Sequence, residues 1–344
     1  MMLPTGRRGI APIFVGMIVL ASVMTWAARV AGAVVPHAEE LRAGQWVQVD
    51  PAASQPASDS ELNNIEDLIT HGRYSEAGNR AVEWLKHNKA SPLRDRALFL
   101  NAEALYRYGD RVKSFFYLDE LLDEYPESRL YYSALEKQFQ IADAFLDGYK
   151  SRFLWIPMIE RQDEAIEMLY RIQQRSPGSP LAERALLRTA DYYYANADYD
   201  LAADAYAAYA RSYPRSPLIP RVKLRQAFAN LAQFRGLRFD ATPIIDARAQ
   251  LTELKTLFPE FAAEQNVDDV IARIDEAMAR KLYVTGDFYR RTHEPVAAGR
   301  TWQYLVERYP NSPMADEAKT EMEKLPPGSV RVQPPATSPS AQAD

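Results

Sequence analysis

The side chains that most often carry catalysis or bind metals are scarce in this chain of 344 residues. Cysteine is absent, which excludes disulfides, thiolate metal sites, a cysteine nucleophile and lipidation on cysteine. The four histidines are His37, His71, His87 and His293, and none has a partner at the spacing of a zinc site. The sequence also lacks HExxH, GxGxxG, P-loop and GxSxG motifs. We therefore expect no metal and no cofactor.

One acidic segment, from Leu118 to Glu124, could place carboxylates together for general acid and base catalysis. The same residues also fit the polar face of a helix whose leucines, Leu118, Leu121 and Leu122, point inward. We favour the helical interpretation, because equivalent places elsewhere in the sequence hold arginine, glutamine or alanine. The chain is therefore expected not to be an enzyme.

Aromatic and basic side chains could instead bind another protein. Tyr192, Tyr193 and Tyr194 form a dense cluster in which Tyr193 occupies a packing position. Tyr192 and Tyr194 suit the core and a binding groove equally well. Arg107 and Arg188 could hold acidic side chains or a terminal carboxylate of a partner, or could be solvated.

The elements that position these side chains come from a spacing that occurs six times. The spacing begins at Tyr74, Arg111, Gln162, Tyr199, Ile244 and Pro295. Three residues later there is always a small residue, namely Ala77, Ser114, Ala165, Ala202, Ala247 or Ala298. Large side chains recur after seven and ten residues, as in Tyr206 and Tyr209. Proline follows after fifteen residues in five of the six, and serine after seventeen in five.

This spacing predicts a helix, a short turn and a second helix in each unit. The residues at three, seven and ten form one helical stripe, and the proline ends that helix. The serine then caps the next helix. Because tetratricopeptide units are only slightly shorter, we expect an all-α, right-handed superhelix of about six tetratricopeptide-like helical pairs over residues 59–325, whose first helices line the concave surface.

The N-terminal residues have the layout of an export signal. Arg7 and Arg8 precede an apolar run from Ile10 to Ala28, and Ala31-Gly32-Ala33 supplies small residues for cleavage. We favour a cleaved signal over 1–33, although the run is also long enough for an uncleaved anchor.

The segments on either side of the repeats differ from them in composition, and the overall charge excludes a nucleic-acid binder. Residues 34–58 are expected to be a linker, and the Pro/Ser/Ala-rich residues 326–344 a disordered tail. With 41 basic and 46 acidic residues the net charge is −5, so the basic footprint of a nucleic-acid binder is missing.

Two stretches resemble the BamD family, also called YfiO, of outer-membrane assembly lipoproteins. They are Lys281–Pro313, which resembles that family's last repeat, and residues 180–217, which resemble an earlier one. The resemblance covers about 59–325 and implies an exported, non-catalytic scaffold for assembling β-barrel proteins in the outer membrane. Members usually carry a lipid on a cysteine, which this chain lacks, so it would be soluble in the periplasm, held at the membrane by an uncleaved signal, or held there by its partner. The alternative is a general periplasmic tetratricopeptide-repeat adaptor for cell-wall or division machinery.

The resemblance also implies the partners, which would be the barrel-assembly pore protein or unfolded barrel substrates. In that family the C-terminal repeats contact the pore protein, which places the corresponding surface here on residues 218–325. Arg273, Arg280, Arg290 and Arg291 lie there and could orient an acidic partner. Alternatively, their stems cover the helix while their charges stay in water.

Overall fold

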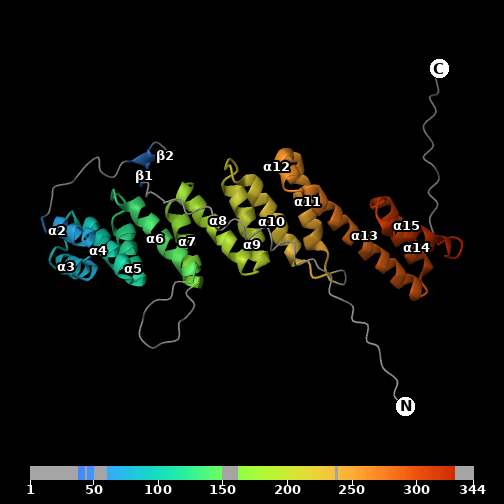
Figure 1. Cartoon of the computed structure of the whole chain (residues 1–344), viewed down its shortest axis with the longest axis horizontal. Helices are drawn as coiled ribbons and strands as arrows, with labels where there is room; N and C mark the ends of the chain where they lie inside the picture. Colours follow the sequence, from blue (N-terminus) through green and yellow to red (C-terminus); the bar gives the residue numbers. More distant parts are fainter. Residues whose placement is uncertain (1–37, 43–44, 50–59, 149–161, 237–238, 330–344) are drawn as a thin grey trace, which may run out of the picture. The chain divides into compact units, whose positions relative to one another are not determined.

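The computed structural model describes residues 38–42, 45–49, 60–148, 162–236 and 239–329 (Figure 1). The chain divides into two compact units, residues 1–57 and 58–344. In the first, strands β1 (Ala38–Arg42) and β2 (Gln45–Val49) pair antiparallel, with Ala38 opposite Val49. The linker prediction did not include this hairpin. The predicted signal at 1–33 lies outside the described residues, as does almost all of the predicted tail.

The second unit contains all fourteen helices of the described residues. The first helices of successive pairs are α2 (Ser60–Thr70), α4 (Arg94–Tyr108), α6 (Tyr131–Leu146), α8 (Pro180–Ala195), α10 (Ile219–Gln233) and α13 (Val267–Arg291). The second helices are α3 (Tyr74–His87), α5 (Arg111–Glu124), α7 (Gln162–Arg175), α9 (Tyr199–Ser212), α11 (Thr242–Leu257) and α14 (Pro295–Arg308). The short α12 (Pro259–Glu264) precedes α13, and α15 (Pro313–Glu323) packs on α13 and α14. The predicted all-α fold of about six pairs is confirmed, and the handedness of its superhelix stays a prediction.

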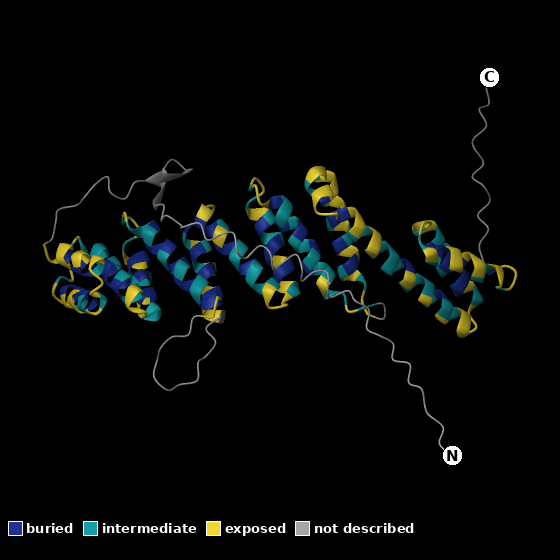
Figure 2. Cartoon of the chain, viewed as in Figure 1, coloured by how far each residue is buried: buried dark blue, intermediate teal, exposed yellow. Residues whose placement is uncertain are grey.

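The repeated spacing marks the second helices closely. Five of them begin at the predicted first residue and are 14 residues long, and α11 begins two residues before Ile244. All six small residues at the third position are 0 % exposed. Large residues after them, such as Tyr206, Tyr209 and Trp302, are also buried and form the core of the pairs. Figure 2 shows buried segments on helices all along the second unit.

Proline ends these helices through the residue before it. Tyr125, Tyr213 and Tyr309 leave the helical region, with φ of −130, −127 and −130° and ψ of 61, 57 and 57°. The ring of a following proline clashes with a helical conformation at the preceding residue. The end of these three helices is therefore encoded locally, whereas Asn88 after α3 adopts a similar conformation, with φ of −115° and ψ of 50°, without a following proline.

The sequence predicts that the serine after each second helix caps the next helix. This prediction is correct for two of the five serines and wrong for three. Ser179 and Ser312 are N-caps, and their hydroxyls accept from the N–H groups of Ala182 and Met314. After the other three serines, Ser91, Ser128 and Ser216, the helix begins three residues later. Each of these serines instead closes a tight turn before the helix begins.

Candidate partner-binding surface on the last helical pair

One exposed stripe on α13 combines cationic and apolar side chains. At 100° per residue, Arg273, Arg280, Val284, Phe288 and Arg291 fall within an arc of about 80°. All five are exposed, with Val284 at 47 % and Phe288 at 53 %. Arginine and aromatic residues are the types that contribute most to protein interfaces. This α13 stripe can therefore bind an acidic partner that also offers an apolar contact.

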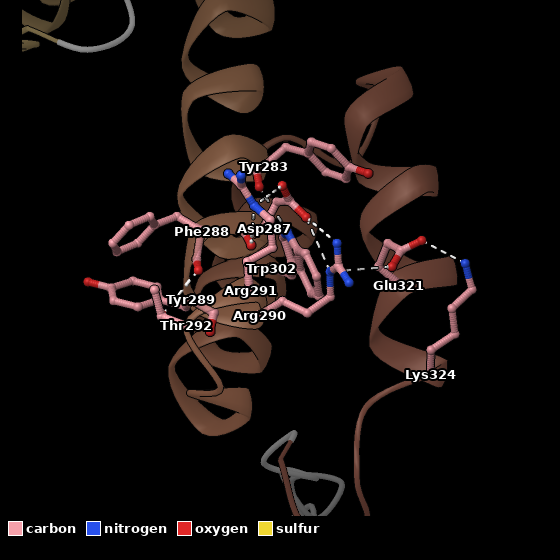
Figure 3. A network of polar contacts seen from close by, with 10 residues as sticks. All are labelled: Tyr283, Asp287, Phe288, Tyr289, Arg290, Arg291, Thr292, Trp302, Glu321 and Lys324. Atoms are coloured by element: carbon pink, nitrogen blue, oxygen red, sulfur yellow. Dashed lines mark hydrogen bonds and ion pairs between the residues drawn. The ribbon is translucent and has the colours of Figure 1, made fainter.

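The four predicted arginines of α13 differ in how far their charges are already compensated. Within the part of the chain that the structure describes, neither Arg273 nor Arg280 forms an ion pair. Arg290 pairs with Asp287 at 2.6 Å and with Glu321 of α15 at 3.9 Å, and Arg291 pairs with Asp287 at 3.0 Å (Figure 3). The uncompensated positive charge of the stripe is thus at Arg273 and Arg280.

The opposite face of α13 is fixed to α14 by a close contact. Gly286 packs against the indole ring of Trp302, which leaves no room for a side chain on the glycine. The indole N–H of Trp302 donates a hydrogen bond to the carbonyl oxygen of Tyr283 at 3.1 Å (Figure 3). Val284 and Phe288 lie two residues to either side of Gly286, so they point away from α14.

Contacts with two further helices hold α13 in place. The Ser312 hydroxyl at the start of α15 donates to Glu276 at 2.6 Å. Arg248 of α11 pairs with Asp275 at 2.5 Å. Because α11, α14 and α15 all contact the inner side of α13, the α13 stripe is held in one orientation.

The predicted binding residues of α4 and α8 lie elsewhere in the molecule. Arg107 is exposed near the end of α4 and pairs with Glu103, one turn earlier, at 2.8 Å. Arg188 on α8 reaches α6, where it pairs with Asp143 and with Asp147, the latter at 2.5 Å. Neither residue is near the α13 stripe in the packing order of the helices.

The tyrosine cluster lies on α8 and is half-buried. Tyr193 and Tyr194 pack against the core around Tyr206. Burial raises the pKa of Tyr193 to about 12 and raises the pKa of Tyr194 above its ordinary value. Tyr192 is also half-buried, with its ring centroid 6.1 Å from that of Tyr193. Tyr194 is therefore at least partly a core residue.

A ladder of ion pairs between first helices was missed by the sequence analysis. Each pair joins a cation on one first helix to an acid on the preceding one, as in Arg96–Glu66, Lys137–Glu103, Arg184–Glu136 and Arg225–Asp191. A signal for it exists in the sequence. Lys137 and Arg225 follow the repeated serine by nine residues, and their partners Glu103 and Asp191 follow the preceding serine by twelve.

The described residues provide no alternative metal or membrane-spanning site. Among them, no three or more acidic, histidine or cysteine side chains are grouped so that they could hold a metal ion. None of the described helices is long and apolar enough to cross a bilayer. The acidic segment 118–124 belongs to α5, where Leu118, Leu121 and Leu122 are buried, as the helical interpretation predicted.

Comparison with known proteins supports the resemblance stated from the sequence. The family model of YfiO, described as an outer membrane lipoprotein, matches residues 159–325, which include all of α13. The resemblance to BamD/YfiO is thus confirmed over those residues. A comparison with curated proteins finds no match.

Several solved structures are similar to this chain. They include PilF of Pseudomonas aeruginosa, at 13 % identity and a TM-score of 0.29, covering 76 % of this chain and 96 % of that one. PilW, a type IV pilus biogenesis factor, is 14 % identical with a TM-score of 0.29, and the match covers 76 % of this chain and 100 % of PilW. The C-terminal part of a TPR repeat-containing protein from Cytophaga hutchinsonii is 14 % identical with a TM-score of 0.32, and the match covers 75 % of this chain and 98 % of that one.

Proposed function

We propose that this protein is an exported, non-catalytic scaffold that serves the assembly of β-barrel proteins into an outer membrane. The observation that carries the proposal is the YfiO family match over 159–325, because that family is described as outer membrane lipoproteins. The export signal predicted at 1–33 agrees with a location in the cell envelope. The partners would be the barrel-assembly pore protein, through residues 218–325, or unfolded barrel substrates.

The α13 stripe is the surface that we assign to the pore protein. It lies in the matched region, its face is held in one orientation, and it presents uncompensated charge at Arg273 and Arg280 beside exposed Val284 and Phe288. The first helices α4, α6, α8 and α10 differ, because the ion-pair ladder compensates charges along them. An acidic partner surface is therefore attracted to α13 more strongly than to the preceding first helices.

The chain lacks the cysteine on which members of the family usually carry a lipid. Under this proposal it is held at the outer membrane by its partner, or at the inner membrane by an uncleaved signal. The same observation favours a second candidate function, a general periplasmic adaptor for cell-wall or division machinery, because such an adaptor needs no lipid.

Capture of the pore protein from envelope extracts by the full chain tests the proposal. Arg273→Glu combined with Arg280→Glu should reduce capture at least tenfold. The melting temperature should stay within about four degrees, because each exposed change moves stability by under about 0.5 kcal/mol. Arg211→Glu with Arg215→Glu is the matched control, since both are exposed and make no ion pair among the described residues. Failure of the unmodified chain to capture the pore protein, with recovery of cell-wall or division proteins, would favour the second function.

A further inference from the structure

The outer face of α14 has a composition unlike that of other second helices. Positions one, five, nine and thirteen after the start of each second helix lie opposite the buried stripe. On α14 these positions hold Val296, Arg300, Tyr304 and Arg308. Val296 is 47 % and Tyr304 55 % exposed, and both arginines are exposed. We call these four residues the α14 face.

Equivalent positions in other units show what an ordinary solvated face looks like in this protein. On α9 they hold Asp200, Asp204, Ala208 and Ser212. On α3 they hold Ser75, Asn79, Glu83 and His87. The arginines at two of these positions on α7, Arg171 and Arg175, are bound to Asp119. On α3, α7 and α9 these positions therefore hold small, polar, acidic or internally paired residues. On α5 and, counted from Ile244, on α11 they expose apolar side chains, such as Phe116 at 64 % and Ile245 at 50 %, but hold no arginine. Of the described second helices, only α14 combines exposed apolar residues with arginines at these positions.

The charges of the α14 face have no counterpart in the described residues. Arg300 and Arg308 form no ion pair there. The neighbouring acid, Glu307, is exposed and accepts a hydrogen bond from Gln303 at 3.0 Å. Two uncompensated guanidinium groups thus flank an exposed tyrosine on one side of one helix, the combination typical of interface anchors.

We propose that the α14 face binds an amphipathic helix of a partner protein whose acidic residues flank an apolar seam. The four residues span twelve positions, or about 18 Å, which is three turns of a partner helix. Tyr304 and Val296 would contact the seam, and Arg300 and Arg308 would pair with the acids. This choice of occupant follows from charge complementarity.

This second surface is independent of the α13 stripe. Gly286 of α13 and Trp302 of α14 pack together between the two helices. The stripe faces away from α14, and the α14 face points away from the buried Ala298 and Trp302. One scaffold can therefore hold two partners at once on the two sides of its last helical pair, which goes beyond the proposed function.

Binding of a synthetic helical peptide to the full chain tests the inference. The probe is an 18-residue peptide with a leucine seam flanked by glutamates, and its control has lysine in place of each glutamate. Fluorescence anisotropy is measured at low and at physiological salt. We expect Arg300→Glu with Arg308→Glu to weaken binding of the acidic peptide at least tenfold, and Tyr304→Ser to weaken it severalfold.

Two matched variants make the result specific. Arg273→Glu with Arg280→Glu changes the net charge equally and alters only the α13 stripe, so it should keep the affinity within about twofold. Equal binding by the α14 variant, or equal binding of the lysine peptide, would overturn the proposal. Sedimentation of the chain alone as a dimer that the α14 variant dissociates would assign the face to a second copy and would also overturn it. Since capture of the pore protein depends on Arg273 and Arg280, failure here leaves the proposed function standing.

Discussion

Replacement of Gly286 by alanine tests whether the last helical pair is held together as described. A Cβ atom at this position would lie 2.6 Å from Cδ1 and 2.7 Å from Cε2 of the Trp302 indole, and closer still to its nitrogen. Carbon atoms in contact prefer about 3.5–4.0 Å, so the ring must retreat by about 1 Å. The indole is rigid and 0 % exposed, so this retreat displaces its neighbours.

The expected change in stability combines three effects. Overpacking costs about 1–3 kcal/mol. Weakening of the hydrogen bond from the Trp302 N–H to the Tyr283 carbonyl adds about 1 kcal/mol. Alanine has a higher helix propensity than glycine, which offsets up to about 1 kcal/mol of this destabilisation. We therefore expect Gly286→Ala to destabilise the last pair by about 1–3 kcal/mol.

Gly78 provides a matched control within the same chain. It is also a buried helical glycine, but a Cβ there would meet Asn101 at 3.7 Å and Ala104 at 4.0 Å, which are ordinary contacts. Gly78→Ala should therefore be neutral or stabilising by up to about 1 kcal/mol. Hydrogen exchange is the best assay, because repeat proteins open locally and neighbouring pairs can stay folded. Faster exchange in α13 and α14 for Gly286→Ala alone is expected. Unchanged exchange in both variants would refute the packing described here.

Three further changes test the repeat, its core and its ion-pair ladder. Ala202→Leu should cost about 1–3 kcal/mol, because Ala202 is fully buried at the close approach of α8 and α9, and an unaltered thermal melt would mean that the register is wrong. Asn101→Leu should raise the urea midpoint, because the buried Asn101 amide has no hydrogen-bond partner in the described residues; a lower midpoint would point to a buried water. Burial raises the pKa of the Glu103 carboxyl, but Lys137 and Arg107 outweigh it and hold that pKa below its ordinary value of 4.5. The ionised Glu103 carboxyl therefore stabilises the folded state fully above pH 4.5, and this stabilisation is lost as the pH falls through the lower pKa of the folded state. Glu103→Gln should make the free energy of unfolding depend less steeply on pH in this range. An equally steep dependence would exclude the contacts of Glu103 with Lys137 and Arg107 as contributors.

The fold was largely predictable because its determinants are local. A small residue at the third position and large residues at seven and ten specify one buried stripe. Proline after Tyr125, Tyr213 and Tyr309 ends the helix at the same place each time. The starts of the first helices were less predictable. Ser91 and Ser179 occupy the same place in the repeat, yet only Ser179 caps a helix directly.

The candidate surface was only partly predictable. The resemblance placed it on residues 218–325, and the charges of Arg273 and Arg280 were visible in the sequence. Val284 and Phe288 were missed, because helical periodicity alone cannot show which apolar residues remain uncovered once α14 and α15 have packed. Arg188 was selected for its charge, but its acidic partners Asp143 and Asp147 lie on another helix.

Charged side chains are compensated to different degrees along the helical pairs. From α2 to α10, cations on one first helix pair with acids on the previous one, so each joint is held by packing and by ion pairs together. On α13 and α14, four arginines have no such partner among the described residues: Arg273, Arg280, Arg300 and Arg308. Uncompensated charge contributes little to stability but attracts a complementary surface. These four arginines are therefore the positions of the last pair at which charge reversal tests the two proposed binding surfaces, and all four lie within the residues that match the YfiO family.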